Sequence, residues 1–578
     1  MHKIIYFSLI CYSITSSVYA LDDVSLPDRI RQEQRFKEFN QQLQNQLPQV
    51  ATVPTSQLSQ NFQQIIVSEQ PCTQIDQITL AQIDGQSSIN LKQFEFLLEA
   101  IEKHPQQISK QCIGTQSLQN LIYFAQNELI KRGFITSQVF VLPQDISQGN
   151  LGLSIQVGRL HKIIIQGDDS VSSLQLKAAL PFREGDVIRL RQLEQGLENL
   201  KRAFAVNMQI IAATENQKEL QGYSDLILQI QPQQKVNFNV IVDDSGSDAT
   251  GKYIGNLGIR LNNPLHLSDI FSVNLSHSLD DLHHDLNKSY LISYQLPLGN
   301  YDISANFNQY QYKQAVLGAN GTLNYHGESQ QGNFNLSRLL SRGGQYKTSL
   351  YGKFYHKEVR NFIDDIEIGV QHRKTSGWST GIQHRQYLSH GVLDINLDYR
   401  HGTGAFNALS APEERIKDIY DQPLAAEGYS RAPIWSADID FNLPFLLLNR
   451  SAQYRLNWRG QYATKLLVPN DRFYIGGRYS VRGFDGDLML SGDHGHSLQQ
   501  EINLNTAVPN TQMYLGIDQG WVNGRNSISG QRYLMGSVVG LRSYQNSFYL
   551  DVFAGRGLIA PQAIKKDWVT GFSLNLFY

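Results

Sequence analysis

The chain has 578 residues, more than one compact core can organise, so we expect at least two domains. A formal net charge of −2 and the lack of a long basic run argue against a nucleic-acid-binding protein. A mean hydropathy of −0.33 would by itself indicate a soluble protein. However, a membrane β-barrel alternates lipid-facing and lumen-facing residues, so its average is also polar.

The first twenty residues have the pattern of a secretory signal peptide. His2 and Lys3 precede a mostly apolar stretch, residues 4–14, and residues 18–20, VYA, supply a small-residue cleavage site. An uncleaved membrane anchor is the alternative, but the apolar run is too short to span a bilayer. We therefore expect an exported protein. No later segment offers a run of about 18 apolar residues for a transmembrane helix.

Cysteine usage agrees with export. Cleavage after Ala20 removes Cys11 and leaves only Cys72 and Cys112. An oxidising compartment favours a disulfide between these two residues. Two free buried thiols are the alternative.

Residues 21–47 are expected to contain one polar helix. Pro27 and Asp28 suit a first turn, and no Gly or Pro follows until Pro48. Apolar residues form only a thin stripe among Gln and charged residues: Ile30, Phe36, Phe39, Leu43 and Leu47. Such a helix suits a wet groove or a water-filled pore, with a solvated, partly disordered N-terminus as the alternative. Residues 48–71, rich in Pro, Gln and Ser, are predicted to be a flexible linker.

Residues 72–233 carry two similar α/β units, 72–157 and 158–233. Each is predicted to run strand, helix, helix, strand, strand, which makes an internal repeat. The predicted helices are 91–102 and 116–132 in the first unit and 171–180 and 190–203 in the second. Each unit is small for independent stability, so a bridge between Cys72 and Cys112 would stabilise the first.

From residue 234 to residue 578 the helical period gives way to period-2 alternation. For example, Tyr454, Leu456 and Trp458 alternate with Arg455, Asn457 and Arg459. A soluble antiparallel β-domain also alternates. The many segments, the full charges on the polar face and the aromatic C-terminal residue Tyr578 favour a closed membrane barrel instead. At about 9 to 11 residues per strand plus turns, this length predicts about sixteen strands around an aqueous channel.

Several stretches together resemble the transporters of bacterial two-partner secretion. These include haemolysin activators, the filamentous-haemagglutinin transporter and exporters of contact-dependent inhibition toxins, all relatives of outer-membrane protein insertases. The two repeats resemble POTRA domains, and the glycine-rich FYIGGRYSVRGF resembles the signature of the sixth extracellular loop. The other matching stretches are PCTQIDQITL, QCIGTQSLQNLI, LPFREGDVIRLRQLEQGLENLKR, VDDSGSDATGKY and YQLPLGNY.

The resemblance implies an internal loop. In this family the signature loop folds back into the barrel, and its arginine pairs with an aspartate of the inner wall. The wall motif matches YLGIDQG, residues 514–520, so Arg482 is expected to pair with Asp518; a solvated loop arginine is the alternative. The residues expected to form this lock are Val481, Arg482, Gly483, Phe484 and Asp518.

The resemblance also implies a function. The chain would be an outer-membrane channel, with its POTRA domains in the periplasm, that recognises a large unfolded exoprotein and secretes it. The helix within residues 21–47 would be a plug helix in the channel, carrying Ile30, Phe36, Phe39 and Leu43. We expect a monomer in outer-membrane lipid, and no enzyme activity, cofactor, metal, nucleotide or nucleic acid. His283, His284, His494 and His496 are expected to be solvated loop residues.

Two alternatives share parts of this plan. An insertase that folds other barrels into the membrane would use the same POTRA-plus-barrel architecture, although insertases usually carry more POTRA domains than the two expected here. A plain diffusion porin would need no POTRA domain.

Overall fold

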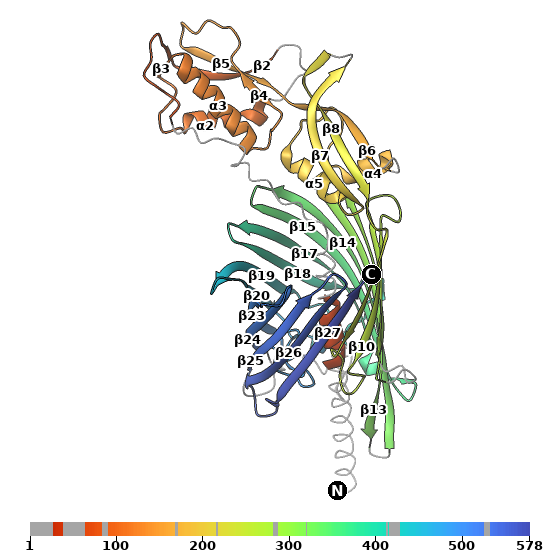
Figure 1. Ribbon diagram of the computed structural model, residues 1–578. Helices are drawn as coiled ribbons and strands as arrows, with labels where there is room; N and C mark the ends of the chain where they lie inside the picture. Colours follow the sequence, from red (N-terminus) through yellow and green to blue (C-terminus); the bar gives the residue numbers. More distant parts are fainter. Residues whose placement is uncertain are drawn as a thin grey trace.

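The computed structural model describes residues 27–37, 64–83, 91–167, 171–215, 218–280, 287–318, 321–411, 414, 428–524 and 532–578. Two small α/β domains stand at one end of a wide β-barrel (Figure 1). The predicted signal peptide, the linker up to residue 63, Phe39, Leu43, His283 and His284 lie outside the described residues. None of the helices within the described ranges is long and apolar enough to cross a membrane.

The first α/β domain packs two helices on a three-stranded sheet. Its elements are β1 (Thr73–Ile75), β2 (Gln77–Gln82), η2 (Leu91–Phe94), α2 (Phe96–Glu102), β3 (Gln111–Ile113), α3 (Thr115–Lys131), β4 (Gln138–Phe140) and β5 (Asn150–Gln156). The sheet order is β2-β5-β4, so β2 is an edge strand. The core includes Phe94, Leu97 and Leu121.

A disulfide joins Cys72 to Cys112 in this domain. It lies beside the small β1–β3 ladder, in which Gln74 pairs with Cys112. This ladder was not predicted from the sequence, because strands of three residues are too short to show a period.

The second α/β domain contains β6 (Arg159–Gly167), α4 (Ser173–Ala179), α5 (Leu190–Leu200), β7 (Phe204–Glu215) and β8 (Lys218–Pro232). Its sheet order is β6-β8-β7. The hydroxyl of Ser172 caps α4 by accepting a hydrogen bond from the Gln175 backbone N–H. Only three residues separate β8 from the first barrel strand, β9 (Val236–Asp243), so this domain stands directly on the barrel.

Sixteen long strands close into an antiparallel barrel, with β9 paired to both β10 and β27. After β9 they are β10 (Ile254–Asn262), β11 (Ile270–Ser278), β12 (Asn287–Leu298), β13 (Tyr301–Gly318), β14 (Gly321–Arg342), β15 (Tyr346–Ile363), β17 (Arg373–Leu388), β18 (Gly391–Thr403), β19 (Ile434–Leu447), β20 (Arg450–Ala463), β23 (His494–Asn505), β24 (Thr511–Asn523), β25 (Tyr533–Tyr544), β26 (Phe548–Ile559) and β27 (Trp568–Phe577). The two-residue β16 (Ile366–Glu367) pairs with β15 and is not counted among the sixteen. The predicted barrel of about sixteen strands is confirmed.

Alternation decides which side chains enter the lumen. On β24, Ile517 is 50% exposed on the outer surface, whereas the next residue, Asp518, is 0% exposed. Apolar residues therefore cover the outside of the barrel and polar residues line its interior, as a membrane barrel requires.

A buried ionic contact fixes the second α/β domain to the barrel rim. Arg342, at the end of β14, has a side chain only 2% exposed and contacts Glu194 at 3.2 Å and Glu198 at 2.8 Å. Lys347 on β15 lies 2.5 Å from the other oxygen of Glu198. Burial opposes ionisation of Glu198, but the charges of Lys347 and Arg342 outweigh it and hold its pKa below the ordinary value of 4.5.

We expect this contact to weaken in acid. Because the folded pKa of Glu198 is lowered, its contribution to stability is full above about 4.5 and is lost as the pH falls through the lower, folded value. Energy transfer between labels on the second domain and the barrel rim should therefore drop between about pH 5 and pH 3. The variant Glu198→Gln should lose this pH dependence; an identical profile in both proteins would contradict the assignment.

Candidate functional site

The loop between β20 and β23, residues 464–493, folds back into the barrel and is called the inward loop below. Its short hairpin pairs β21 (Phe473–Ile475) with β22 (Leu490–Gly492). Buried loop residues pack on the wall in one apolar cluster: Ile475, Val481, Phe484, Leu490, Val522, Leu534 and Ile564. Such burial distinguishes the inward loop from a solvated surface loop.

Arg482 lies at the tip of this loop and contacts Asp518 through both sides of its guanidinium. Nε donates to Asp518 Oδ2 at 2.7 Å and Nη2 donates to Oδ1 at 2.9 Å. The Arg482 backbone N–H also donates to Oδ2, at 2.9 Å. This is the planar two-point contact that a buried guanidinium favours, and it joins the two residues that the resemblance had paired.

A second carboxylate holds the same arginine. Glu501 on β23 accepts from Arg482 Nη1 at 2.7 Å and from Arg542 Nη1 at 2.5 Å. Arg542 in turn donates to Asp551 at 3.0 Å and lies 3.9 Å over the ring of Tyr514. Along this chain of contacts acidic and basic side chains alternate, in the order Asp518, Arg482, Glu501, Arg542 and Asp551, and the four wall residues come from four neighbouring strands, β23 to β26. Sequence reasoning missed Glu501, Arg542 and Asp551, because their proximity depends on the strand register.

Glycines in the barrel wall leave the space that the inward loop occupies. A Cβ atom added at Gly536 would lie 1.9 Å from the carbonyl oxygen of Arg482, and one at Gly557 would lie 2.5 Å from the ring of Phe484. Real Cβ atoms do not approach other atoms this closely, so only glycine lets the loop reach the wall. The wall glycines within about 3 Å of the loop by this measure are Gly495, Gly516, Gly520, Gly536, Gly555, Gly557 and Gly571.

Replacing Gly536 by Val is expected to unseat the inward loop, because the Cβ atom would collide with backbone rather than with a flexible side chain. Trypsin cleavage after Arg478 or Arg482 should then become much faster, while the folded barrel keeps its mobility in unheated SDS gels. Gly352→Val on β15 is the matched control, since a Cβ atom there meets nothing within 4 Å. Equal cleavage of both variants would show that the wall glycines do not seat the loop.

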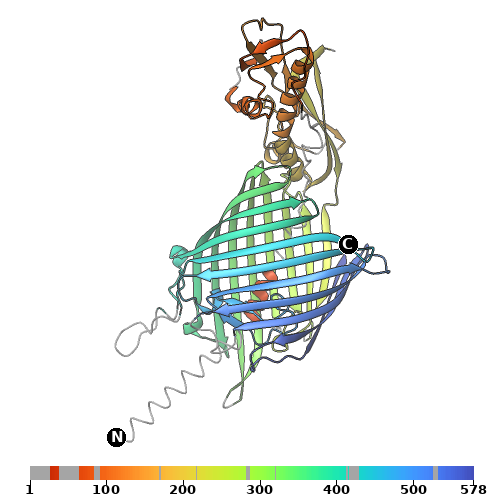
Figure 2. The same cartoon turned by 90° about the vertical axis from the view of Figure 1, so that its left-hand side faces the viewer.

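A helix occupies the lumen. Residues 27–37 are helical and lie inside the barrel in both views (Figures 1 and 2); they are called the lumen helix below. Ile30 packs on Tyr474 of the inward loop, with Met489 beside them. Phe36 is half-buried. The helix therefore contacts the loop through Ile30, one residue of the apolar stripe that the sequence predicted.

Charged side chains connect the lumen helix to the inward loop and to three strands of the barrel wall. Arg31 contacts Asp487 of the inward loop at 3.2 Å, and Arg35 contacts Asp243 at the end of β9 at 3.2 Å. Lys37 contacts Asp438 on β19 at 2.8 Å, and Glu33 pairs with Lys357 on β15. Since these strands lie on different sides of the barrel, the helix is held across the lumen rather than against one wall.

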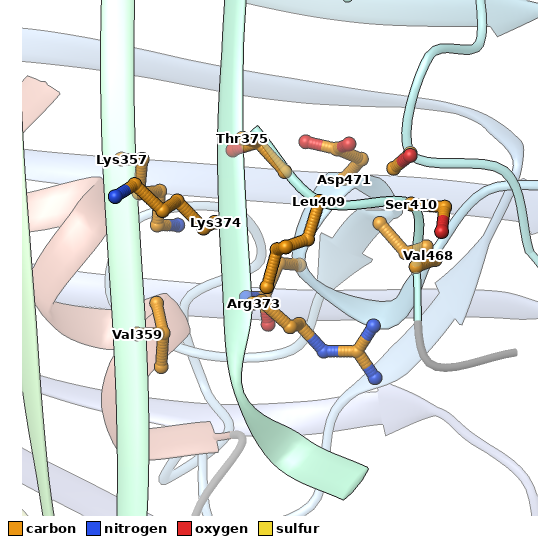
Figure 3. Close-up of a pocket in the computed structure, with 12 residues that line it drawn as sticks. Lys357, Val359, Arg373, Lys374, Thr375, Leu409, Ser410, Val468 and Asp471 are labelled. Atoms are coloured by element: carbon orange, nitrogen blue, oxygen red, sulfur yellow. The ribbon is translucent and has the colours of Figure 1, made fainter. Parts of the chain in front are cut away.

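A small pocket lies near Lys357, between the barrel wall and loop residues that include Leu409, Val468 and Asp471 (Figure 3). Its volume of about 20 Å³ has room for a water molecule and not for a peptide or a cofactor. Within the described ranges no group of three or more His, Cys, Asp or Glu side chains is arranged to hold a metal ion.

Comparison with known proteins identifies the chain. The family model for haemolysin secretion/activation proteins ShlB/FhaC/HecB matches residues 222–543, more than half of the chain, and POTRA models match residues 87–158 and 159–211. The chain belongs to this family. It is an outer-membrane transporter of two-partner secretion, and its two α/β domains are POTRA domains on the periplasmic side.

Individual relatives agree with this assignment. The structure of CdiB from Acinetobacter baumannii is 60% identical, with a TM-score of 0.87 over 96% of this chain and 99% of that chain. The outer membrane transporter CdiB-2 of Burkholderia pseudomallei (strain 1026b) is 27% identical over 88% of this chain and 87% of its own length. The hemolysin transporter ShlB of Serratia marcescens is 26% identical over 80% of each. These matches favour the transporter over the insertase alternative.

The structure corrects one expectation about this transporter. His494 and His496, expected in a solvated loop, lie at the start of β23. There His494 stacks on Tyr462 and His496 packs near Trp521, with ring centroids 4.8 and 5.7 Å apart. The sequence HGH has no β-branched or large aliphatic residue, so its strand character was not visible.

Proposed function

We propose that this transporter secretes a large partner exoprotein of the contact-dependent inhibition class. The observation that carries the proposal is its 60% identity to CdiB from Acinetobacter baumannii along nearly the whole of both chains. The exoprotein would bind unfolded at the POTRA domains, cross the lumen and fold outside the cell. Folding outside gives direction to the transport without a nucleotide.

The first POTRA domain offers a place for an extended segment. A groove of about 550 Å³ runs between the edge strand β2 and helix α2. Half-buried apolar residues line it, among them Leu80, Leu91 and Leu98, with Lys92 and Glu95 beside them. An extended peptide can add to the open edge of β2 while its side chains enter the groove. We infer that the N-terminal signal of the exoprotein binds here.

The lumen needs a closure that can be removed. The lumen helix and the inward loop both occupy it, but their anchoring differs. The helix is held mainly by ion pairs and one apolar contact, whereas the loop is held by a bidentate pair and an apolar cluster. In our proposal the helix is the removable plug, the loop stays locked through Arg482 and Asp518, and the transporter acts as a monomer in outer-membrane lipid.

Secretion of the candidate exoprotein tests the proposal. Its N-terminal signal fragment is expressed in a host without two-partner transporters, with or without this chain, and the culture medium is assayed. Fragment should appear outside only when the chain is present. Retention of the fragment, combined with failure of other barrels to assemble when the chain is depleted in its native cell, would instead indicate an insertase.

Placing one charged side chain in the groove tests whether the exoprotein signal binds there. Leu98→Asp places a carboxylate among the apolar side chains of the groove and should lower secretion roughly tenfold, the effect of about 1.4 kcal/mol of binding energy. Tyr123→Asp, on the exposed face of α3, is the matched control. Equal secretion by the two variants would exclude the groove as the binding site.

A further inference from the structure

The two POTRA domains are joined by more than the covalent chain, and their contact is called the domain joint below. Leu190, the first residue of α5 in the second domain, donates its backbone N–H to the carbonyl oxygen of Gly133 in the first domain at 2.9 Å. The first N–H groups of a helix have no partner within it, so the first domain satisfies one that α5 leaves open. At the boundary the N–H of Gly158 donates to the hydroxyl of Ser137 at 3.0 Å, and Ser137 is 0% exposed.

Each domain also packs an apolar side chain on the core of its neighbour. Val187 of the second domain lies against the core of the first, and Ile135 of the first domain lies against the core of the second. The domains approach so closely at Gly158 that a Cβ atom there would lie 2.1 Å from Oγ1 of Thr136. Rotating one domain relative to the other would expose both apolar side chains to water, so the domain joint favours one orientation.

Arg189 crosses the domain joint with an exposed side chain. Its guanidinium lies 5.0 Å from the centre of the Phe134 ring, and Nη2 donates to Oε1 of Gln93 at 3.3 Å. Phe134 in turn stacks on Phe96, with ring centroids 6.1 Å apart. Because the face of an aromatic ring attracts a cation, Arg189 fastens the second domain to η2 and to the start of α2.

The segment that Arg189 holds is also a wall of the groove in the first POTRA domain. Lys92 and Glu95 line this groove. Gln93 and Phe96, the residues that follow each of them in the sequence, contact Arg189 and its ring stack instead. One side of the segment therefore faces the groove and the other side faces the domain joint. The orientation of the groove is set by the contact that Arg189 makes.

The second domain is fixed at its other end to the barrel rim, through Arg342, Glu194 and Glu198. A continuous series of contacts therefore runs from the groove wall to the channel. We propose that the domain joint, with Arg189 as its positioning residue, holds the groove in one orientation toward the channel entrance, so that a segment bound there is directed into the lumen. The inference rests on the proposed function, because it assigns the groove a role after binding.

Secretion into the medium and binding of the purified signal fragment to the full-length protein are measured side by side. Arg189→Glu sets a negative charge against the face of Phe134 and should lower secretion at least roughly fivefold, while the dissociation constant of the fragment stays within about twofold. Arg189→Lys keeps a cation over the ring and should restore most of the secretion. Arg183→Glu is the matched control, because this exposed arginine of the same loop makes no side-chain contact within the described residues.

The orientation itself is measured as the distance between spin labels on introduced cysteines at two exposed positions, Gln119 on α3 and Gln209 on β7. The unmodified protein should give one narrow distance distribution, and Arg189→Glu a broader one. Gly158→Ala opens the domain joint in a second way, because its Cβ atom must push against Thr136. It should also broaden the distribution and lower secretion.

Three results would overturn the proposal. The first is normal secretion by variants whose distance distribution is broadened, and the second is an unchanged distribution in both Arg189→Glu and Gly158→Ala. The third is a loss of fragment binding as large as the loss of secretion, because the domain joint would then shape the groove rather than direct it. Equal binding of the fragment by Leu98→Asp and the unmodified protein is a separate result, which would refute the groove as the binding site.

Discussion

Replacing Arg482 by Ala is expected to lower secretion of the exoprotein at least roughly tenfold while the barrel still assembles, because removing one partner of a buried ion pair costs about 3–5 kcal/mol. The substitution leaves Asp518, which is 0% exposed, and Glu501 without their shared cation. The inward loop would then lose its fixed position although its apolar cluster remains. Secretion is measured in the culture medium, and assembly by the mobility of the unheated barrel in SDS gels.

Two variants control for loss of charge and for general damage to the loop. Arg482→Lys keeps the positive charge but cannot make the two-point contact, so it should rescue secretion only in part. Arg472→Ala removes another loop arginine, which contacts a backbone carbonyl, and should secrete normally. Normal secretion by Arg482→Ala would show that the contact with Asp518 does not lock the loop for transport.

Removing the lumen helix is expected to raise the ion conductance of the transporter several-fold in a planar bilayer. Residues 27–37 lie inside the barrel and are held by charged contacts on different sides of it, so deleting them opens the path that they occupy. Unchanged conductance in the deletion variant would remove the plug hypothesis.

A charge swap tests whether the ion pairs keep the helix in place. Lys37→Asp and Asp438→Lys each set like charges against one another and should increase the frequency of open events. The double variant restores the pair with its sign reversed and should return conductance toward that of the unmodified chain. Additive effects in the double variant would show that this contact does not retain the helix.

Local patterns predicted much of the architecture. Period-2 alternation depends only on which face of a strand each side chain occupies, and it predicted the barrel and its approximate strand number. The two repeated α/β units and the polar helix also followed from local periodicity. The contact between Arg482 and Asp518 could be named only because two short motifs resembled those of a known family.

Contacts across the barrel needed the tertiary structure. Arg35 and Asp243 are 208 residues apart, and Arg31 and Asp487 are 456 residues apart. No local pattern connects such residues, and shifting the register of one strand by one residue would turn its side chains to the other face. The charge chain through Glu501 and Arg542 and the glycines beneath the loop depend on that register.

The sequence by itself determined an exported chain with two α/β units, a membrane barrel and a helix too polar for a dry core, because periodicity and composition are local properties. Only the tertiary structure decided what the helix and the inward loop contact, and that Arg189 joins the two POTRA domains. The physical reason is packing between elements distant in the sequence, which brings Arg189 to Gln93 across 96 residues of chain.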